Sequence, residues 1–248
     1  MFPVIQVGPL AIQSGGLFFL LGIYAAGLLA EAQAKKQAPQ HKDAISTIIF
    51  LAALAGLVGA RIGFVLRYPA AFSAQPWSAL LPTPTMLDGG TGALTAALAL
   101  FILGQRRKIG LYEMADLLAP GLAGMAFFLA LAGLASGSSS GIPTALPWGI
   151  AQFGAVRHPV GLYWLIGAGA LLGLFWPRAP KAGRPAGTRF FSLAAAEVGL
   201  IILILPFRAE TALNISGGMR TQVGALFLLA VCLGLLYARW NAAEEKQA

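Results

Sequence analysis

The chain has very little charge and almost no cysteine. Of its 248 residues, 10% are Asp, Glu, Lys or Arg and 58% are apolar, whereas about a quarter of a typical soluble protein is charged. Together with a mean hydropathy of +0.76, this composition excludes a soluble globular domain and a disordered chain. The single cysteine, Cys232, lies in an apolar run. An intrachain disulfide is therefore excluded, and we expect Cys232 to be a small buried side chain.

Acidic residues are the scarcer charged class, with 9 Asp and Glu against 17 Lys and Arg, which gives a formal net charge of +8. In a soluble protein this balance would favour nucleic acid as a partner. Apolar runs surround almost every charge here, so we predict a membrane as the surroundings and no nucleic-acid partner. We also predict no cofactor and no metal site, because one cysteine gives no support to a cysteine-based centre.

Long apolar stretches dominate the remaining sequence. Crossing a bilayer takes about 20 helical residues, and seven stretches come close to that length. They predict an all-α integral membrane protein with a single transmembrane domain, residues 1–248, and seven transmembrane helices at 13–32, 44–66, 86–104, 112–134, 159–176, 190–207 and 221–238. No basic residue precedes Lys35, so we expect the first stretch to remain as a membrane helix and not to be cleaved as a signal peptide.

Basic residues are divided unequally between the two sides of these predicted helices. Cytoplasmic loops of membrane proteins carry an excess of Lys and Arg, which predicts an outside amino terminus and a cytoplasmic carboxyl terminus. Twelve basic residues fall on the predicted cytoplasmic side: Lys35, Lys36, Lys42, Arg106, Arg107, Lys108, Arg178, Lys181, Arg184, Arg189, Arg239 and Lys246. The other five, all arginines, fall at or near the outer face: Arg61, Arg67, Arg157, Arg208 and Arg220.

The outer arginines are candidate ligands for an anionic headgroup. The planar guanidinium holds a phosphate or carboxylate with two parallel hydrogen bonds, which lysine does not; the alternative is that they anchor helices at the headgroup level. Arg61 lies about 8 Å inside its predicted helix, where an ionisable group usually faces a cavity or a partner. It stands between Gly59 and Gly63, a spacing that lets a neighbouring helix approach closely.

The sequence Arg157-His158-Pro159 opens the fifth predicted helix. Proline suits the first helical turn, and the free N–H groups there favour an anion, which predicts a phosphate site beside Arg157. His158 has an unperturbed pKa of about 6.5 and is therefore a candidate base. The alternative is that both residues only cap and anchor the helix.

Carboxylates near predicted helix ends have two interpretations. Asp88 precedes Gly89 and Gly90; it suits an N-cap, or the glycines let a lipid headgroup reach the backbone while Asp88 accepts a proton. Asp116 lies near the start of the fourth predicted helix and suits that helix's own amino terminus. Glu197 lies well inside the sixth, where a lone carboxylate must be paired or protonated; Arg61 is a candidate partner.

Several of these residues belong to short motifs whose order resembles that of the bacterial phosphatidylglycerol:prolipoprotein diacylglyceryl transferases. The resemblance runs nearly end to end and includes Gly59-Ala60-Arg61-Ile62-Gly63, Gly89-Gly90 and Arg157-His158-Pro159 with Leu162-Tyr163. Further matching pieces are Phe2-Pro3-Val4-Ile5, Gly8-Pro9-Leu10, Asp116 with Ala119-Pro120, Pro143-Thr144 with Pro147-Trp148-Gly149-Ile150, Phe207-Arg208 and Gln222.

The resemblance implies a multi-pass protein of the bacterial plasma membrane, with its site facing the outer side. Such a protein transfers a diacylglyceryl group from phosphatidylglycerol to the lipobox cysteine of a prolipoprotein, whose signal peptide it meets in the membrane. Arg61, Arg157 and Arg208, with Gly89 and Gly90, are the implied phospholipid-binding residues. His158 or Asp88 is the implied base that helps to form the attacking thiolate.

The chain departs from this family's pattern at positions that the family uses in catalysis. Asp88 stands where the family has the histidine of a His-Gly-Gly motif, and other departures are at Gln13, Gly15, Ala130, Gly133, Ser138, Ile201 and Leu205. The second hypothesis is therefore a catalytically inactive member that binds lipid or lipoprotein. A retinal photoreceptor is excluded because residues 221–238 contain no lysine. A channel or transporter is disfavoured because few charged groups lie deep in the predicted helices.

Overall fold

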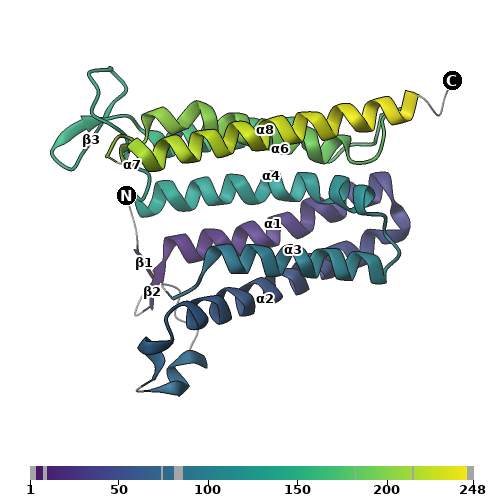
Figure 1. Cartoon of the computed structure of the whole chain (residues 1–248), viewed down its shortest axis with the longest axis horizontal. Helices are drawn as coiled ribbons and strands as arrows, with labels where there is room; N and C mark the ends of the chain where they lie inside the picture. The colour runs from purple at the N-terminus through teal and green to yellow at the C-terminus, as the bar shows by residue number, and fades with distance from the viewer. Residues whose placement is uncertain are drawn as a thin grey trace.

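The computed structural model describes residues 4–7, 10–73, 75–80, 86–181, 183–213 and 215–244. Long helices run side by side in alternating directions in this part of the chain (Figure 1). The helices are α1 Ser14–Gln37, α2 Lys42–Arg67, α3 Gly89–Arg106, α4 Leu111–Ser136, α5 Val160–Leu174, α6 Thr188–Ile204, α7 Ala209–Leu213 and α8 Ile215–Glu244, with 3-10 turns at Pro39–His41, Pro69–Phe72, Pro76–Leu80 and Leu205–Phe207.

Each of the seven predicted transmembrane stretches corresponds to a helix, but the helices differ in length. Five segments are long and apolar enough to cross a membrane: Ser14–Gln37, Pro39–Arg67, Leu111–Ser136, Thr188–Phe207 and Gly217–Ala242. Helix α3 has 18 residues and α5 only 15. The short α5 has a physical reason, because Pro159 precedes it and Pro177 follows its end, and the residue before a proline avoids the helical conformation.

Two β-hairpins that the sequence did not predict lie at one end of the helices, here called the hairpin end (Figure 1). Strand β1 (Val4–Val7) pairs with β2 (Leu10–Gln13), and β3 (Ile150–Gln152) pairs with β4 (Ala155–Arg157), both antiparallel. Helix α8 runs away from this end. The opposite end, here called the basic end, carries the α1–α2, α3–α4 and α5–α6 connections. Of the twelve basic residues predicted to share one side, eleven lie at the basic end; Lys246 lies outside the described residues.

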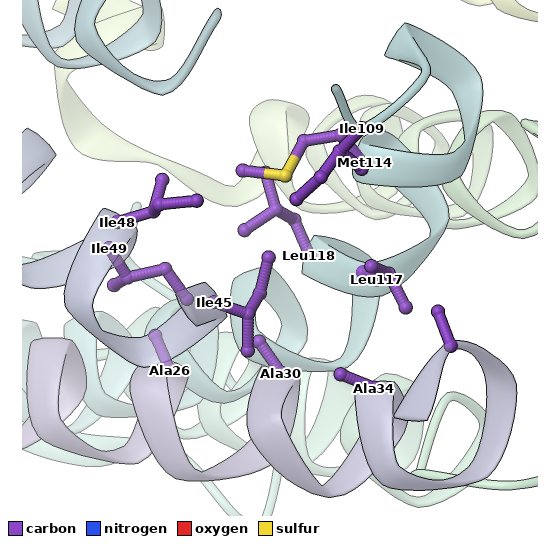
Figure 2. Close-up of a cluster of buried hydrophobic side chains, with 11 residues drawn as sticks. Ala26, Ala30, Ala34, Ile45, Ile48, Ile49, Ile109, Met114, Leu117 and Leu118 are labelled. Atoms are coloured by element: carbon purple, nitrogen blue, oxygen red, sulfur yellow. The ribbon is translucent and has the colours of Figure 1, made fainter. Parts of the chain in front are cut away.

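Helix α4 lies at the centre of the molecule, with α1, α2 and α3 on one side and α6 and α8 on the other (Figure 1). Figure 2 shows the larger buried cluster, in which α1 contributes a row of alanines at a spacing of four, Ala26, Ala30 and Ala34. Their small side chains let Ile45 from α2 and Leu117 from α4 reach the same core. Apolar helices do not attract one another strongly in lipid, so such close contact is what holds them together. Cys232 of α8 is buried, as predicted.

Asp116 stabilises a different helix from the one predicted. It lies in the second turn of α4 but accepts hydrogen bonds from the backbone N–H groups of Gly187 at 2.7 Å and Phe190 at 2.9 Å. Gly187 has a φ of +94°, a left-handed conformation that favours glycine, and it turns the chain into α6. Asp116 therefore satisfies the free N–H groups at the start of α6, and it does not cap its own helix.

The close approach predicted at Gly59 and Gly63 is confirmed, and the neighbouring helix is α3. A Cβ atom added at Gly59 would overlap the side chain of Thr95, and one added at Gly63 would overlap Thr91. Glycine at these positions lets the two backbones come together, which fixes the start of α3 beside the end of α2.

We expect Gly59→Ala to lower the free energy of unfolding by about 1–3 kcal/mol, the usual cost of overpacking a close contact. The matched control is Gly224→Ala on α8, where an added Cβ would meet nothing within 4 Å and helix propensity gains about 0.5–1 kcal/mol. Thermal unfolding in detergent measures both changes. Equal stability of the two variants would show that α2 and α3 do not depend on this contact.

Candidate functional site

A short extended segment, residues 140–144, joins two parts of the hairpin end. On one side its backbone pairs with β4 and the residue after it, through Thr144 N–H to Val156 O at 2.9 Å and His158 N–H to Ile142 O at 3.0 Å. On the other side Ile142 N–H donates to Phe207 O at 2.9 Å, and Ala209 N–H donates to Ser140 O at 3.0 Å. The start of α5 and the end of α6 are thereby held against one segment.

This pairing places Arg157 and Arg208 on either side of Gly141. Gly141 forms a β-bridge with Arg208, and Pro143 forms one with Arg157. The Arg157 guanidinium donates to the carbonyl oxygens of Gly141 at 3.0 Å and Gln152 at 3.3 Å. A side chain at Gly141 would overlap the backbone of His158, so glycine is required for the approach. Two of the predicted phosphate ligands therefore belong to one cluster.

His158 lies in the same cluster, with 8% of its surface exposed. Its Nδ1 lies 3.1 Å from the hydroxyl oxygen of Tyr163, which also accepts a hydrogen bond from Trp148 Nε1 at 3.0 Å. The ring of Phe207 lies 4.9 Å from the His158 ring, centroid to centroid. When Nδ1–H donates to Tyr163, Nε2 is left as the acceptor, which is the form that a general base needs.

The sequence did not identify three residues as part of this site: Tyr163, Trp148 and Gly141. Tyr163 lies five residues after His158, slightly more than one helical turn, so its contact with the imidazole has a weak local signal. The contacts of Trp148 and Gly141 come from pairing between distant segments, which has no signature in a single sequence.

Arg61 lies in a second cluster at the hairpin end. Its guanidinium donates to three backbone carbonyl oxygens, those of Ser78 at 2.5 Å, Ala79 at 2.8 Å and Met86 at 3.0 Å. The same guanidinium lies over the ring of Phe72, 5.2 Å from its centroid. The partner of Arg61 is therefore the backbone between α2 and α3, and not the predicted Glu197.

Asp88 is the N-cap of α3, as one of its two interpretations predicted. Its carboxylate accepts hydrogen bonds from the Thr91 backbone N–H at 2.8 Å and the Thr91 hydroxyl at 2.7 Å, and Arg67 lies 3.1 Å away. The Thr91 backbone N–H, then its hydroxyl and then Arg67 hold the pKa of Asp88 below its ordinary value. A carboxylate of low pKa is a weak base, so of the two candidate bases Asp88 is less suited to the role than His158. Gly89 and Gly90 form the first turn of α3 beside it.

Glu197 does not pair with Arg61. It lines a cavity of about 240 Å³ between α4 and α6, together with Leu122, Ala126, Phe190, Leu193 and Ala194. Its Oε1 is buried and accepts no hydrogen bond from the described residues. The structure thus separates the predicted site residues into three places: the cluster around Arg157, His158 and Arg208, the cluster around Arg61 and Asp88, and the Glu197 cavity.

The apolar helices define a multi-pass membrane protein, and its hairpin end carries His158 and five arginines: Arg61, Arg67, Arg157, Arg208 and Arg220. Over residues 3–238 the chain matches the family model described as prolipoprotein diacylglyceryl transferase. The chain therefore belongs to the prolipoprotein diacylglyceryl transferase family.

Curated relatives of similar length are named phosphatidylglycerol–prolipoprotein diacylglyceryl transferases. The chain is 28% identical to the one from Geobacter sulfurreducens over 83% of this chain and 80% of the relative. It is 30% identical to the one from Brucella anthropi, over 97% and 91% of the two chains. It is 27% identical to the one from Nitratidesulfovibrio vulgaris, over 95% and 92%.

We expect Tyr163→Phe to destabilise the hairpin end, because it removes a hydrogen-bond partner from both His158 and Trp148. Each lost bond is worth about 0.5–1.5 kcal/mol, so the free energy of unfolding should fall by about 1–3 kcal/mol. Tyr24→Phe on the exposed face of α1 is the control, and thermal unfolding in detergent is the measurement. If both variants melt together, the Tyr163 hydroxyl does not support the cluster.

Proposed function

We propose that the chain transfers a diacylglyceryl group from phosphatidylglycerol to the cysteine thiol of a prolipoprotein lipobox. The observation that carries this proposal is the family match over residues 3–238, with relatives of similar length named for that reaction. The cluster around Arg157, His158 and Arg208 supports it, because it combines cationic donors with a candidate base at one end of the membrane helices.

In this reaction the cysteine sulfur attacks the glyceryl carbon that bears the phosphate oxygen. A C–S bond forms, the C–O bond breaks, and glycerol phosphate leaves with the bonding electron pair. The thiolate is the attacking species, so the thiol proton must pass to a base. We assign this role to His158, since the hydrogen bonds to Asp88 make that carboxylate the weaker base.

Cationic donors lower the barrier because negative charge gathers on the departing phosphate. We assign Arg157 and Arg208 to the phosphate, since Arg157 donates to the Gly141 carbonyl and Arg208 forms a β-bridge with Gly141. Arg61, Gly89 and Gly90 lie in the second cluster and are proposed to meet the lipid headgroup there. Holding the phosphate in a defined place also aligns the reacting carbon with the thiol.

The proposed reaction is tested by incubating purified protein with phosphatidylglycerol and a peptide that contains a lipobox cysteine. Mass spectrometry should detect the diacylglyceryl adduct, and a peptide with serine in place of the cysteine should remain unmodified. We expect Arg157→Gln, Arg208→Gln and His158→Asn each to lower kcat/KM at least about 10-fold, equivalent to about 1.4 kcal/mol of transition-state stabilisation. Arg220→Gln on α8 is the control and should leave activity unchanged.

The Geobacter sulfurreducens relative, assayed alongside, serves as the positive control. If it modifies the peptide and this chain does not, the chain lacks the proposed activity. Retained binding of phosphatidylglycerol in that case would favour a member of the family that only binds lipid.

We further propose that α1 to α6 and α8, including the shorter α3 and α5, all cross a bacterial plasma membrane, with the hairpin end outside. The gathering of basic residues in the connections at the opposite end supports this orientation. It would place the cluster of Arg157 and His158 on the side where lipobox cysteines emerge, with the prolipoprotein signal peptide beside the helices.

Two exposed glutamines provide a matched test of the orientation. Gln75 lies near the hairpin end and Gln105 near the basic end. In a Cys232→Ala background, a membrane-impermeant maleimide should label Gln75→Cys but not Gln105→Cys in intact spheroplasts, and should label both after permeabilisation. Labelling of Gln105→Cys alone in intact cells would reverse the orientation.

A further inference from the structure

The connection between α5 and α6 carries only positive charge. Residues 175–189 contain Arg178, Lys181, Arg184 and Arg189 and no Asp or Glu. This connection lies at the basic end, far along the helices from the cluster around Arg157 (Figure 1). No acidic residue of the connection balances these four positive charges, so any neutralising group must come from outside the connection.

The first part of this connection is held firmly by α1. Gln33 is fully buried, at 0% exposure, and binds the backbone of Arg178 twice. Its Oε1 accepts from Arg178 N–H at 3.1 Å, and its Nε2 donates to Arg178 O at 3.1 Å. Lys36 Nζ donates to Pro177 O at 2.8 Å. The backbone that carries Arg178 is thus fixed before any ligand arrives.

Two guanidinium groups meet at one oxygen of this backbone. Arg189 donates to the carbonyl oxygens of Phe175 and Trp176, both at 2.7 Å. Arg178 Nε donates to the same Trp176 oxygen at 3.4 Å. Among the described residues no carboxylate lies within ion-pair distance of either arginine. The carboxylate of Asp116 attracts Arg189 at longer range, but its hydrogen bonds are with backbone N–H groups of Gly187 and Phe190.

Like charges this close repel each other, and an anion beside them removes that cost. A phosphate diester suits the planar, bidentate donors of arginine. Arg178, Lys181 and Arg184 are all exposed, so such a group can reach them.

The apolar neighbours of these cations identify the source of the phosphate. Trp176 is 55% exposed and Leu174 is 63% exposed, and they lie two and four residues before Arg178 in the chain. Tryptophan favours the level of the lipid headgroups, and the exposed Leu174 at the end of α5 offers an apolar surface to acyl chains. A free phosphate would use neither side chain and a nucleic acid would not use the leucine, whereas a phospholipid uses both.

We infer that the α5–α6 connection is a binding site for the headgroup of an anionic phospholipid, formed by Arg178, Arg184 and Trp176 on the backbone that Gln33 fixes. This site is separate from the hairpin end and does not rest on the proposed transfer reaction. Its ligand is a bound lipid of the leaflet at the basic end.

Native mass spectrometry of the detergent-solubilised full chain, titrated with cardiolipin, tests the inference. We expect the Arg178→Gln/Arg184→Gln double variant to raise the Kd for cardiolipin at least about 5-fold, equivalent to about 1 kcal/mol. The control is Arg106→Gln/Arg107→Gln, which removes the same charge from exposed positions at the same end and should change Kd less than 2-fold. Trp176→Ala should also weaken binding.

Three outcomes would overturn the inference. Equal weakening by the two double variants would mean attraction to the whole basic end and no defined site. Equal affinity of the unaltered chain for cardiolipin and phosphatidylcholine would remove the role of the phosphate charge. Competition by free glycerol phosphate at the lipid's own concentration would assign the site to a soluble phosphate. Melting temperatures check that each variant is folded, and an unchanged transferase assay separates this site from the hairpin end.

Discussion

The structure depends on one constraint, which is that backbone carbonyl groups leaving a helix beside a membrane must still find donors. Arginine supplies many of them here. A single guanidinium has five N–H groups and stays charged, so it can bind several carbonyls of one turn at once. Both ends of the molecule use this arrangement: Arg61 binds the chain after α2, Arg157 binds Gly141 and Gln152, Arg189 binds the end of α5, and Arg239 binds Ala186.

Between the two ends, small residues replace hydrogen bonds as the means of cohesion. Gly59 and Gly63 bring α2 against α3, and the alanines of α1 let α2 and α4 share one core. The middle of the molecule therefore sets the distances between helices, and the ends set which irregular segments meet. The segment 140–144 shows the consequence. It can pair with both β4 and Phe207–Ala209 only when the ends of α4 and α6 and the start of α5 lie at the same level.

The sequence predicted the parts of this structure that have a local signal. Apolar length located the seven helices, the spacing of Gly59 and Gly63 predicted a close helix contact, and Asp88 before two glycines predicted a cap. It did not reveal that Asp116 binds the start of α6, or that Tyr163 contacts His158 and is itself bound by Trp148. The contact of Asp116 joins segments that are far apart in the chain. Tyr163 is close to His158 in the chain, but the site around them is completed by other segments. For the same reason the sequence did not show that Arg61 binds backbone carbonyl oxygens. The predicted pairing of Arg61 with Glu197 is therefore wrong.

The two arginines of the hairpin cluster differ in the charge that they offer to a phosphate. Arg208 donates to Glu210 at 2.6 Å, and this exposed carboxylate cancels much of its field. Arg157 binds only carbonyl oxygens among the described residues, which orient the guanidinium without neutralising it. An anion that approaches Gly141 is therefore attracted mainly by Arg157, and at Arg208 it competes with the carboxylate of Glu210. A dianionic leaving group competes with a carboxylate better than a lipid phosphodiester does. In the proposed reaction we therefore expect Arg208 to act late, as glycerol phosphate departs.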